Sequence, residues 1–197
     1  MLFRSPARQP PFLPVAMHDA LADGIKAGGW TVECNRDLAA VQKTLQCAHA
    51  ASLLYYYCHG KSDAPLAADP LSKLAFGTTQ IDPAWIQDEP RFTQTPVVVL
   101  NSCSSGEANP LSFISFLERF RSKGAAGVVS TWFAIPMLFA SAFGRELVTQ
   151  YAARVPIGDA LYDLRRRLLD QDHPLGLFYA LQCPMDLQAP AVRRDPA

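Results

Sequence analysis

A histidine and a cysteine each follow a short apolar stretch of the sequence, and together they could supply covalent chemistry. His59 ends the run Ser52-Leu-Leu-Tyr-Tyr-Tyr-Cys-His, and Cys103 comes three residues after Val97-Val-Val-Leu100. A cysteine becomes a useful nucleophile when a base takes its proton and an oxyanion site receives the developing charge. Gly60 lets the backbone turn sharply beside the histidine, so its N–H could face an incoming carbonyl. The sequence therefore predicts a His59–Cys103 pair with an oxyanion hole formed by the backbone N–H groups of Gly60 and Cys103.

Two strands must deliver these residues to the same place. Short apolar runs rich in β-branched residues are typical of strands buried on both faces, as in a parallel sheet. Ligands of open α/β sheets bind outside the carboxyl ends of the strands, where both residues fall. Cys58 precedes His59 and should point to the opposite face of its strand, into the core. The serines around Cys103 lack the Gly-x-Ser-x-Gly pattern of a serine nucleophile.

The rest of the chain alternates between strand and helix patterns, which predicts an α/β domain with helices on both faces of the sheet. The first part reads as βαβαβ, and the segment after His59 reads as a hairpin followed by a short helix that begins at Asp82-Pro83. The expected strands cover residues 12–15, 30–34, 52–59, 71–81 (the hairpin), 97–100, 126–130 and 175–182, and the longer helices 17–27, 37–49, 111–123, 136–154 and 157–169.

Composition excludes several classes of protein. The chain has 197 residues, enough for one domain with a core, and its 18 basic and 18 acidic residues cancel, so we expect no binding to nucleic acid. No apolar run approaches the length of a membrane span, and prolines interrupt the N-terminus where a signal peptide would need an apolar core. We therefore expect a cytoplasmic protein without membrane contact. Five scattered cysteines fit neither a disulfide framework nor a zinc site, so we expect no metal or cofactor.

Three motifs carry a resemblance to a known family. Tyr57-Cys-His-Gly60, Val98-Val-Leu-Asn-Ser-Cys-Ser-Ser-Gly106 and Val128-Val-Ser-Thr-Trp132 resemble the CHAT domain, a family of bacterial caspase-like peptidases in the clan of caspases, separase and gingipains. The likeness covers roughly Phe12 to Cys183. The separation of 44 residues (103 − 59 = 44) is close to the roughly 50 residues between histidine and cysteine in caspases. Where the family usually has an Ala-Cys-Glu-type run, this chain reads Asn-Ser-Cys-Ser-Ser.

The resemblance implies a caspase-haemoglobinase fold, which is a three-layer α/β/α sandwich around a mostly parallel central sheet. It further implies a cysteine endopeptidase that cleaves a protein substrate with a His59–Cys103 dyad. We expect one CHAT domain over residues 12–185, an N-terminal extension over 1–11 and a flexible tail over 186–197. Family members typically follow helical sensor repeats. This chain begins at Met1 without such repeats, so we expect either a separate sensor or activator protein or a chain cut from a longer one, in a prokaryotic defence or cell-death system.

Substrate choice in the clan is made by a charged pocket beside the dyad. The acidic candidates for this pocket are Asp63, Asp82, Glu107 and Asp163, and an acidic pocket would favour a basic side chain before the cleaved bond. Trp132, after the strand at 126–130, is a candidate wall of the substrate cleft.

Two other functions fit parts of the sequence. A non-catalytic interaction domain could keep the same fold as a scaffold, although such a domain has no physical need for both His59 and Cys103. A flavodoxin-like receiver or nucleotide-binding domain would share the parallel sheet. This chain lacks the glycine-rich phosphate loop and the acidic cluster after the first strand that such a domain would require.

Overall fold

A computed structural model of the chain describes residues 12–34, 38–46, 50–62, 72–76, 79–102, 110–133 and 135–191. Within these residues, six strands form one sheet in the order β3-β2-β1-β4-β5-β6. The strands are β1 (Leu53–Ser62), β2 (Ser72–Phe76), β3 (Thr79–Ile81), β4 (Val97–Ser102), β5 (Gly127–Thr131) and β6 (Tyr179–Gln182). The helices are α1 (Phe12–Ala27), α2 (Leu38–Gln46), α3 (Pro110–Ser122), α4 (Met137–Ala152) and α5 (Ile157–Leu169), with 3-10 turns η1 (Pro83–Trp85) and η2 (Pro174–Phe178).

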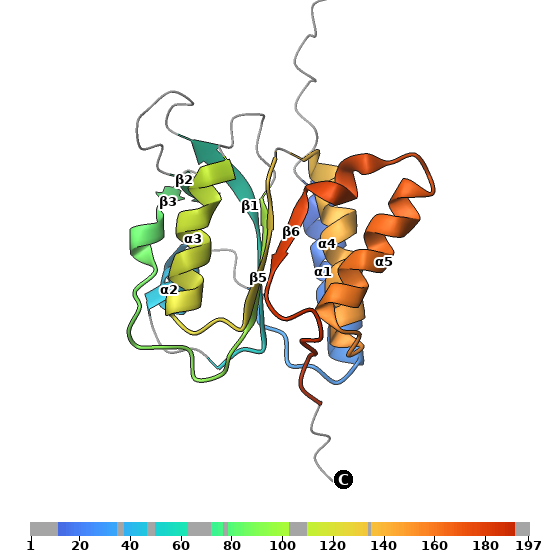
Figure 1. Cartoon of the computed structure of the whole chain (residues 1–197). Coiled ribbons are helices and arrows are strands. Elements are labelled where there is room, and N and C mark those ends of the chain that lie inside the picture. Colours follow the sequence, from blue (N-terminus) through green and yellow to red (C-terminus); the bar gives the residue numbers. More distant parts are fainter. Residues whose placement is uncertain are drawn as a thin grey trace, which may run out of the picture.

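The sheet is the middle layer of an α/β/α sandwich, as the sequence predicted. Helices α2 and α3 lie on one side of it, and α1, α4 and α5 lie on the other (Figure 1). The three central strands β1, β4 and β5 are parallel. At the two sides of the sheet, β2 is antiparallel to β1, β3 is antiparallel to β2, and β6 is antiparallel to β5. None of the described helices combines the length and apolar character that crossing a membrane requires.

Strand alternation divides the core into two parts. Leu54, Tyr56 and Cys58 of β1 pack with α2 and α3, whereas Tyr55 and Tyr57 pack on the side of α4 and α5. Cys58 is 7% exposed, which confirms its predicted place in the core. The central strand β4 is covered on both sides, because all four residues of its apolar run are at most 1% exposed. This strand is therefore buried as its sequence predicted.

Two predicted strands at the start of the chain were wrong. Residues 12–15 form the first turn of α1, where a proline fits because the first N–H groups of a helix have no intrahelical acceptor. Residues 30–34 are not paired in the sheet. Trp30 instead donates its indole Nε1–H to the carbonyl of Ala152 at the end of α4, at 3.2 Å, which ties this segment to the helical layer. The expected βαβαβ beginning is therefore replaced by two helices before β1.

Two further predictions need correction at strand ends. The predicted strand over 175–182 is a 3-10 turn followed by the shorter β6, and the Arg165 side chain of α5 donates to the carbonyls of Gly176 and Tyr179, which holds this turn against the helix. β1 does not end at His59 but continues to Ser62. Gly60 therefore pairs with Leu74 in an extended strand and makes no sharp turn, because β2 provides hydrogen-bonding partners beyond the end of β4.

The remaining helices and the hairpin follow the sequence closely. The β2–β3 hairpin is present beside β1, and Asp82 caps η1 by accepting a hydrogen bond from the Ala84 N–H at 2.8 Å. Gly124 ends α3 with a φ of 102°, a left-handed conformation that glycine adopts without strain. Asp37 and His49, at the limits of the second predicted helix, lie outside the described residues.

The chain after β6 packs back on the domain before it leaves the described part. The carbonyls of Met185 and Leu187 accept hydrogen bonds from the Gly158 and Ile157 N–H groups at the start of α5, both at 2.9 Å. Ala189 is 1% exposed. Residues 186–189 are thus held against α5, and the predicted tail and domain limits otherwise stay predictions, with residues 192–197 outside the described range.

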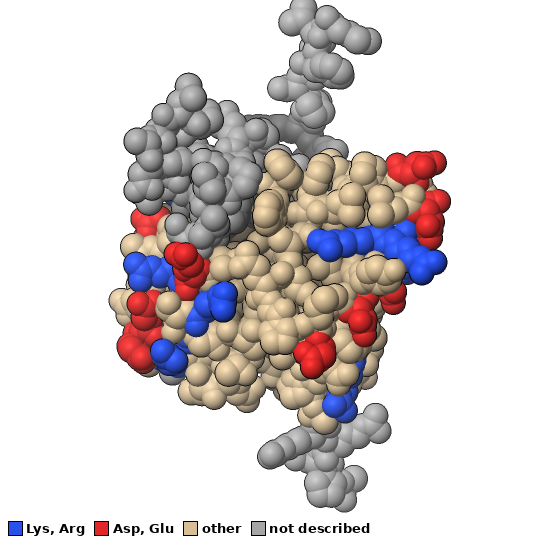
Figure 2. All heavy atoms as spheres, viewed as in Figure 1, with Lys and Arg blue, Asp and Glu red and all other residues tan. Residues whose placement is uncertain are grey.

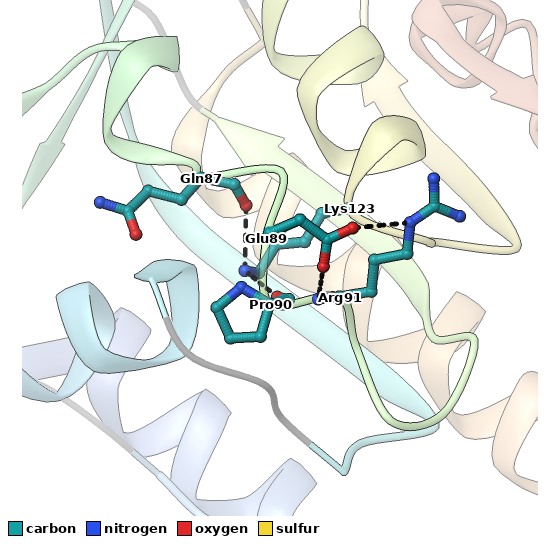
Figure 3. Close-up of polar contacts among 5 residues, drawn as sticks. All are labelled: Gln87, Glu89, Pro90, Arg91 and Lys123. Atoms are coloured by element: carbon teal, nitrogen blue, oxygen red, sulfur yellow. Dashed lines mark hydrogen bonds and ion pairs between the residues drawn. The ribbon is translucent and has the colours of Figure 1, made fainter.

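A buried lysine fastens the long connection between β3 and β4. Lys123, just after α3, is 0% exposed and donates from Nζ to the carbonyls of Gln87 at 3.0 Å and Pro90 at 2.9 Å (Figure 3). Its Nζ also lies 5.3 Å from the centre of the Phe92 ring. The Glu89–Arg91 ion pair drawn beside it is exposed on both sides and contributes little. Lys123 is therefore a buried contact that holds this connection to α3, where Arg119 also pairs with Asp88 at the surface.

We predict that Lys123→Met destabilises the fold. Methionine keeps the apolar length of the side chain but leaves two carbonyls without their charged donor, which should lower the free energy of unfolding by about 2 kcal/mol. Chemical denaturation of the purified chain would measure this change. The control is Lys26→Met, because Lys26 is half exposed and pairs with the exposed Asp23, and its change should stay within about 0.5 kcal/mol. Equal effects of the two substitutions would contradict the role given to Lys123.

Candidate active site

The predicted dyad positions follow a register that is fixed between β1 and β4. These strands pair in parallel from Leu53↔Val97 to Cys58↔Ser102, and the next residues along the chain are His59 and Cys103. The backbone of His59 continues in β1, where it pairs with Ala75 of β2. Cys103 lies outside the described residues, as do Asp63 and Glu107. The described geometry thus brings the two strand ends together up to the residue before each member of the dyad.

The other predicted pocket residues differ in whether their side chains could contact a substrate. Trp132 follows β5 directly, donates its backbone N–H to the Phe178 carbonyl at 2.8 Å, and leaves its side chain 51% exposed. Asp82 follows Ile81, the last residue of β3. Ile81 pairs with Leu74 of β2, which in turn pairs with Gly60 of β1. Asp82 therefore lies level with the end of the sheet where Gly60 lies, two strands away from β1. Its carboxylate is engaged in capping η1. Asp163 is exposed on α5.

A buried polar network, which the sequence did not predict, lies directly beneath this end of the strands. The side chain of Asn101 in β4 is 0% exposed. Its Nδ2 donates to Tyr55 Oη of β1 at 2.8 Å and to the Ala140 carbonyl of α4 at 2.7 Å. Its Oδ1 accepts from Tyr179 Oη of β6 at 2.7 Å. The only signal in the sequence was an asparagine at the end of an otherwise apolar strand, two residues before Cys103.

The network needs a glycine on the facing helix. Gly144 lies one turn after Ala140 in α4, and a Cβ built there would overlap Asn101 Nδ2 and lie 2.5 Å from Tyr55 Oη. Side-chain atoms do not approach this closely, so any larger residue would push the two polar groups apart. The glycine is therefore explained by the close approach of α4 to the Asn101 network.

An imidazole of α1 covers the neighbouring part of β1. The His18 ring lies 4.2 Å from the Tyr57 ring and 5.6 Å from the Tyr55 ring, centre to centre. Its Nε2 is buried and has no hydrogen-bond partner within the described part of the chain. Burial lowers the pKa of His18 below its ordinary value, although the nearby Asp19 carboxylate acts in the opposite direction. His18 is therefore neutral at neutral pH and packs as an aromatic side chain.

Charge is sparse on one face of the molecule. Figure 2 shows basic and acidic side chains gathered over the helices at the two flanks, with an uncharged surface between them. Exposed apolar side chains at the end of β5 and in η2 include Trp132, Phe133 and Leu177. Within the residues that the structure describes, no three His, Cys, Asp or Glu side chains gather where they could hold a metal ion.

Comparison with known proteins agrees with this architecture. The sequence matches the CHAT domain family over residues 10–191, which is nearly the whole chain. The chain belongs to the CHAT domain family. This CHAT domain is also 30% identical, over 138 residues, to a protein of Vitiosangium sp. (strain GDMCC 1.1324) that is named a probable protease. The matched segment is 64% of this chain but only 17% of the relative's length. The chain thus spans about a sixth of that larger protein.

We predict that Gly144→Ala destabilises this CHAT domain, although alanine is the better helix former. The added methyl group must displace Asn101 or Tyr55, and overpacking of this kind typically costs about 1–3 kcal/mol of unfolding free energy. The matched control is Gly24→Ala in α1, where a Cβ would meet nothing within 4 Å. That substitution should raise the stability by up to about 1 kcal/mol. Denaturation curves that shift in the same direction for both variants would contradict the account.

We predict that His18 makes the CHAT domain less stable in mild acid. Because the pKa of His18 is lowered by folding, the unfolded chain binds a proton more readily, so stability is lost as the pH falls below the ordinary histidine value. In His18→Phe the drop in unfolding free energy between about pH 7.5 and about pH 5.5 should be smaller than in the wild type. Denaturant titrations at the two pH values would measure it, and an unchanged drop in the variant would contradict this assignment.

Proposed function

We propose that this chain is a cysteine endopeptidase in which His59 and Cys103 form the catalytic dyad. The observation that carries the proposal is the register of β1 with β4, because Tyr57 pairs with Asn101 and Cys58 with Ser102 immediately before the two residues. Tyr57 and Asn101 both bond to carbonyls at the start of α4, those of Met137 and Ala140, so they share one face of the sheet. If the two-residue period continues one residue beyond β4, positions 59 and 103 fall on that same face, and the proposal places the two side chains there.

The chemistry follows from these residue types. His59 takes the proton of the Cys103 thiol, and the thiolate attacks the carbonyl carbon of the peptide bond. The proposed donors to the resulting oxyanion are the backbone N–H groups of Cys103 and of Gly60, the latter from the extended strand β1 and not from the turn that the sequence predicted. His59 then returns the proton to the leaving amine, and water hydrolyses the thioester to release the acid and the free thiol. Each step uses only this chain's residues, the substrate and water.

The substrate and the setting belong to the same proposal. Trp132 is the proposed wall of the cleft, since it follows β5 at the same edge of the sheet and half of its side chain is exposed. Asp63, Asp82 and Glu107 are the proposed acidic groups that select a basic side chain, with Asp82 the weakest candidate because it caps η1. We propose that a separate sensor protein activates the enzyme in the cytoplasm of a prokaryote, in defence or regulated cell death. The similarity to a protein named a probable protease supports the activity.

We predict that Cys103 reacts unusually fast with iodoacetamide. A thiol held beside a histidine is largely ionised at neutral pH, whereas a free thiol is ionised to only a few per cent, so its alkylation at about pH 7 should be about tenfold faster. Cys34, which is exposed, serves as the internal reference in the same molecule. Mass spectrometry of digested samples over time would give both rates.

The control variant for this prediction is His59→Ala. It should slow the alkylation of Cys103 to the rate of Cys34 and leave Cys34 unaffected. If Cys103 and Cys34 react equally fast in the wild type, the dyad is contradicted and a non-catalytic interaction domain becomes the better description.

A further inference from the structure

Asn101 places a polar side chain in an otherwise apolar strand, two residues before the proposed nucleophile. The four preceding residues of β4 are apolar and buried, and Asn101 itself is 0% exposed. β4 ends at Ser102, so Cys103 is only two residues beyond Asn101, and two residues of extended chain span at most about 7 Å. Whatever fixes Asn101 therefore also limits where the chain can deliver Cys103.

The hydrogen-bonding capacity of the Asn101 amide is used by the protein itself. Both hydrogens of Nδ2 are donated, one to Tyr55 Oη and one to the Ala140 carbonyl, and Oδ1 accepts from Tyr179 Oη. No donor is left over for a substrate. The three partners belong to β1, α4 and β6, so one side chain joins β4 to three other elements. Asn101 is thus a tether in the core and has no donor with which to contact substrate.

The hydrogen bonds of Asn101 fix the position of β4 more than they add to the stability of the fold. A buried carboxamide costs free energy unless it is hydrogen-bonded, and an apolar side chain of similar size would fill this site without that requirement. A one-residue slip of β4 would turn Asn101 to the opposite face and leave Tyr55 and Tyr179 without their partner. The stacking of the Tyr179 ring on Phe143, at 3.9 Å between ring centres, holds one of these partners in place. The network therefore selects a single register for the end of β4.

We infer that Asn101 is a positioning residue that, through Tyr55, Tyr179 and the Ala140 carbonyl, holds the carboxyl end of β4 so that Cys103 meets His59. This inference rests on the proposed function, because it needs Cys103 to be the nucleophile. Misplacing a reacting group by about 1 Å can cost about 100-fold in rate, so a tether at this distance has a measurable effect. The close fit of Gly144 against Asn101 and Tyr55 is part of the same arrangement.

The test measures how the alkylation of Cys103 by iodoacetamide depends on pH in the full chain. The variants are Asn101→Ala and Tyr179→Phe, the latter keeping its ring on Phe143 but losing the hydroxyl that donates to Asn101. The control is Val129→Ala in β5, which opens the same core next to Val99 but removes no hydrogen bond of the network, because the valine side chain has no polar atom. Circular dichroism selects a temperature at which every variant is folded. If Asn101→Ala does not fold, Tyr179→Phe decides the test by itself.

The inference expects the pH midpoint of Cys103 alkylation to rise in both network variants toward the free thiol value of about 8.5, with an approximately tenfold lower rate at about pH 7. Val129→Ala should keep the wild-type midpoint, because a loss of core packing alone does not alter the His59–Cys103 pair. Wild-type midpoints in both network variants, or an equal rise in Val129→Ala, would overturn the inference and leave the proposed function standing. A wild-type midpoint already at the free thiol value would overturn both.

Discussion

The parallel pairing of β1 with β4 is the constraint on which the rest of this molecule depends. β4 pairs with β1 on one side and with β5 on the other, and its apolar run is buried on both faces, so its backbone groups find their partners within the sheet. The two helical layers follow from this requirement, because a sheet with two apolar faces must be covered on both. β4 ends at Ser102, whereas β1 continues along β2. The chemistry is proposed at this point, where the two strands separate.

Two of the buried polar side chains tie separate elements together. Lys123 fastens the β3–β4 connection to α3 through two carbonyls on one side of the sheet. Asn101 joins β4 to β1, α4 and β6 on the other side. Hydrophobic burial gives this fold its stability but is not directional. The hydrogen bonds of Lys123 and Asn101 are directional and fix how the elements are placed relative to one another. The Asn101 network, which is nearer to the proposed dyad, joins four elements.

The sequence predicted the elements whose local signals agree with their tertiary surroundings. The Val97–Leu100 run, the Asp82 cap and the Gly124 terminus each carry their cause within a few residues. The strand prediction for residues 12–15 failed because prolines are tolerated both in a first helical turn and in an edge strand. The strand prediction for residues 30–34 failed because a strand needs a neighbouring strand to pair with. Trp30 instead donates a hydrogen bond to Ala152 of α4, 122 residues away.

In the candidate site, too, the residues with a local signal could be predicted and those held by distant contacts could not. The order and spacing of His59 and Cys103 could be predicted, since both follow recognisable strands. The Asn101 network could not, because its partners lie 39 to 78 residues away along the chain. The need for glycine at 144 is likewise invisible until α4 is placed against β1 and β4. Contacts between distant elements decide how a site is held, even where its reactive residues can be predicted from sequence.

The most direct test of the central claim is cleavage of a mixed peptide library by the wild-type chain and by Cys103→Ala, with candidate activator proteins from neighbouring genes added. Cys34→Ala is the matched control for the loss of a thiol. The account predicts cleavage by the wild type and by Cys34→Ala, none by Cys103→Ala, and cut sites that report the preferred side chain. Cleavage that persists in Cys103→Ala, or that no chain shows with any activator present, would contradict it.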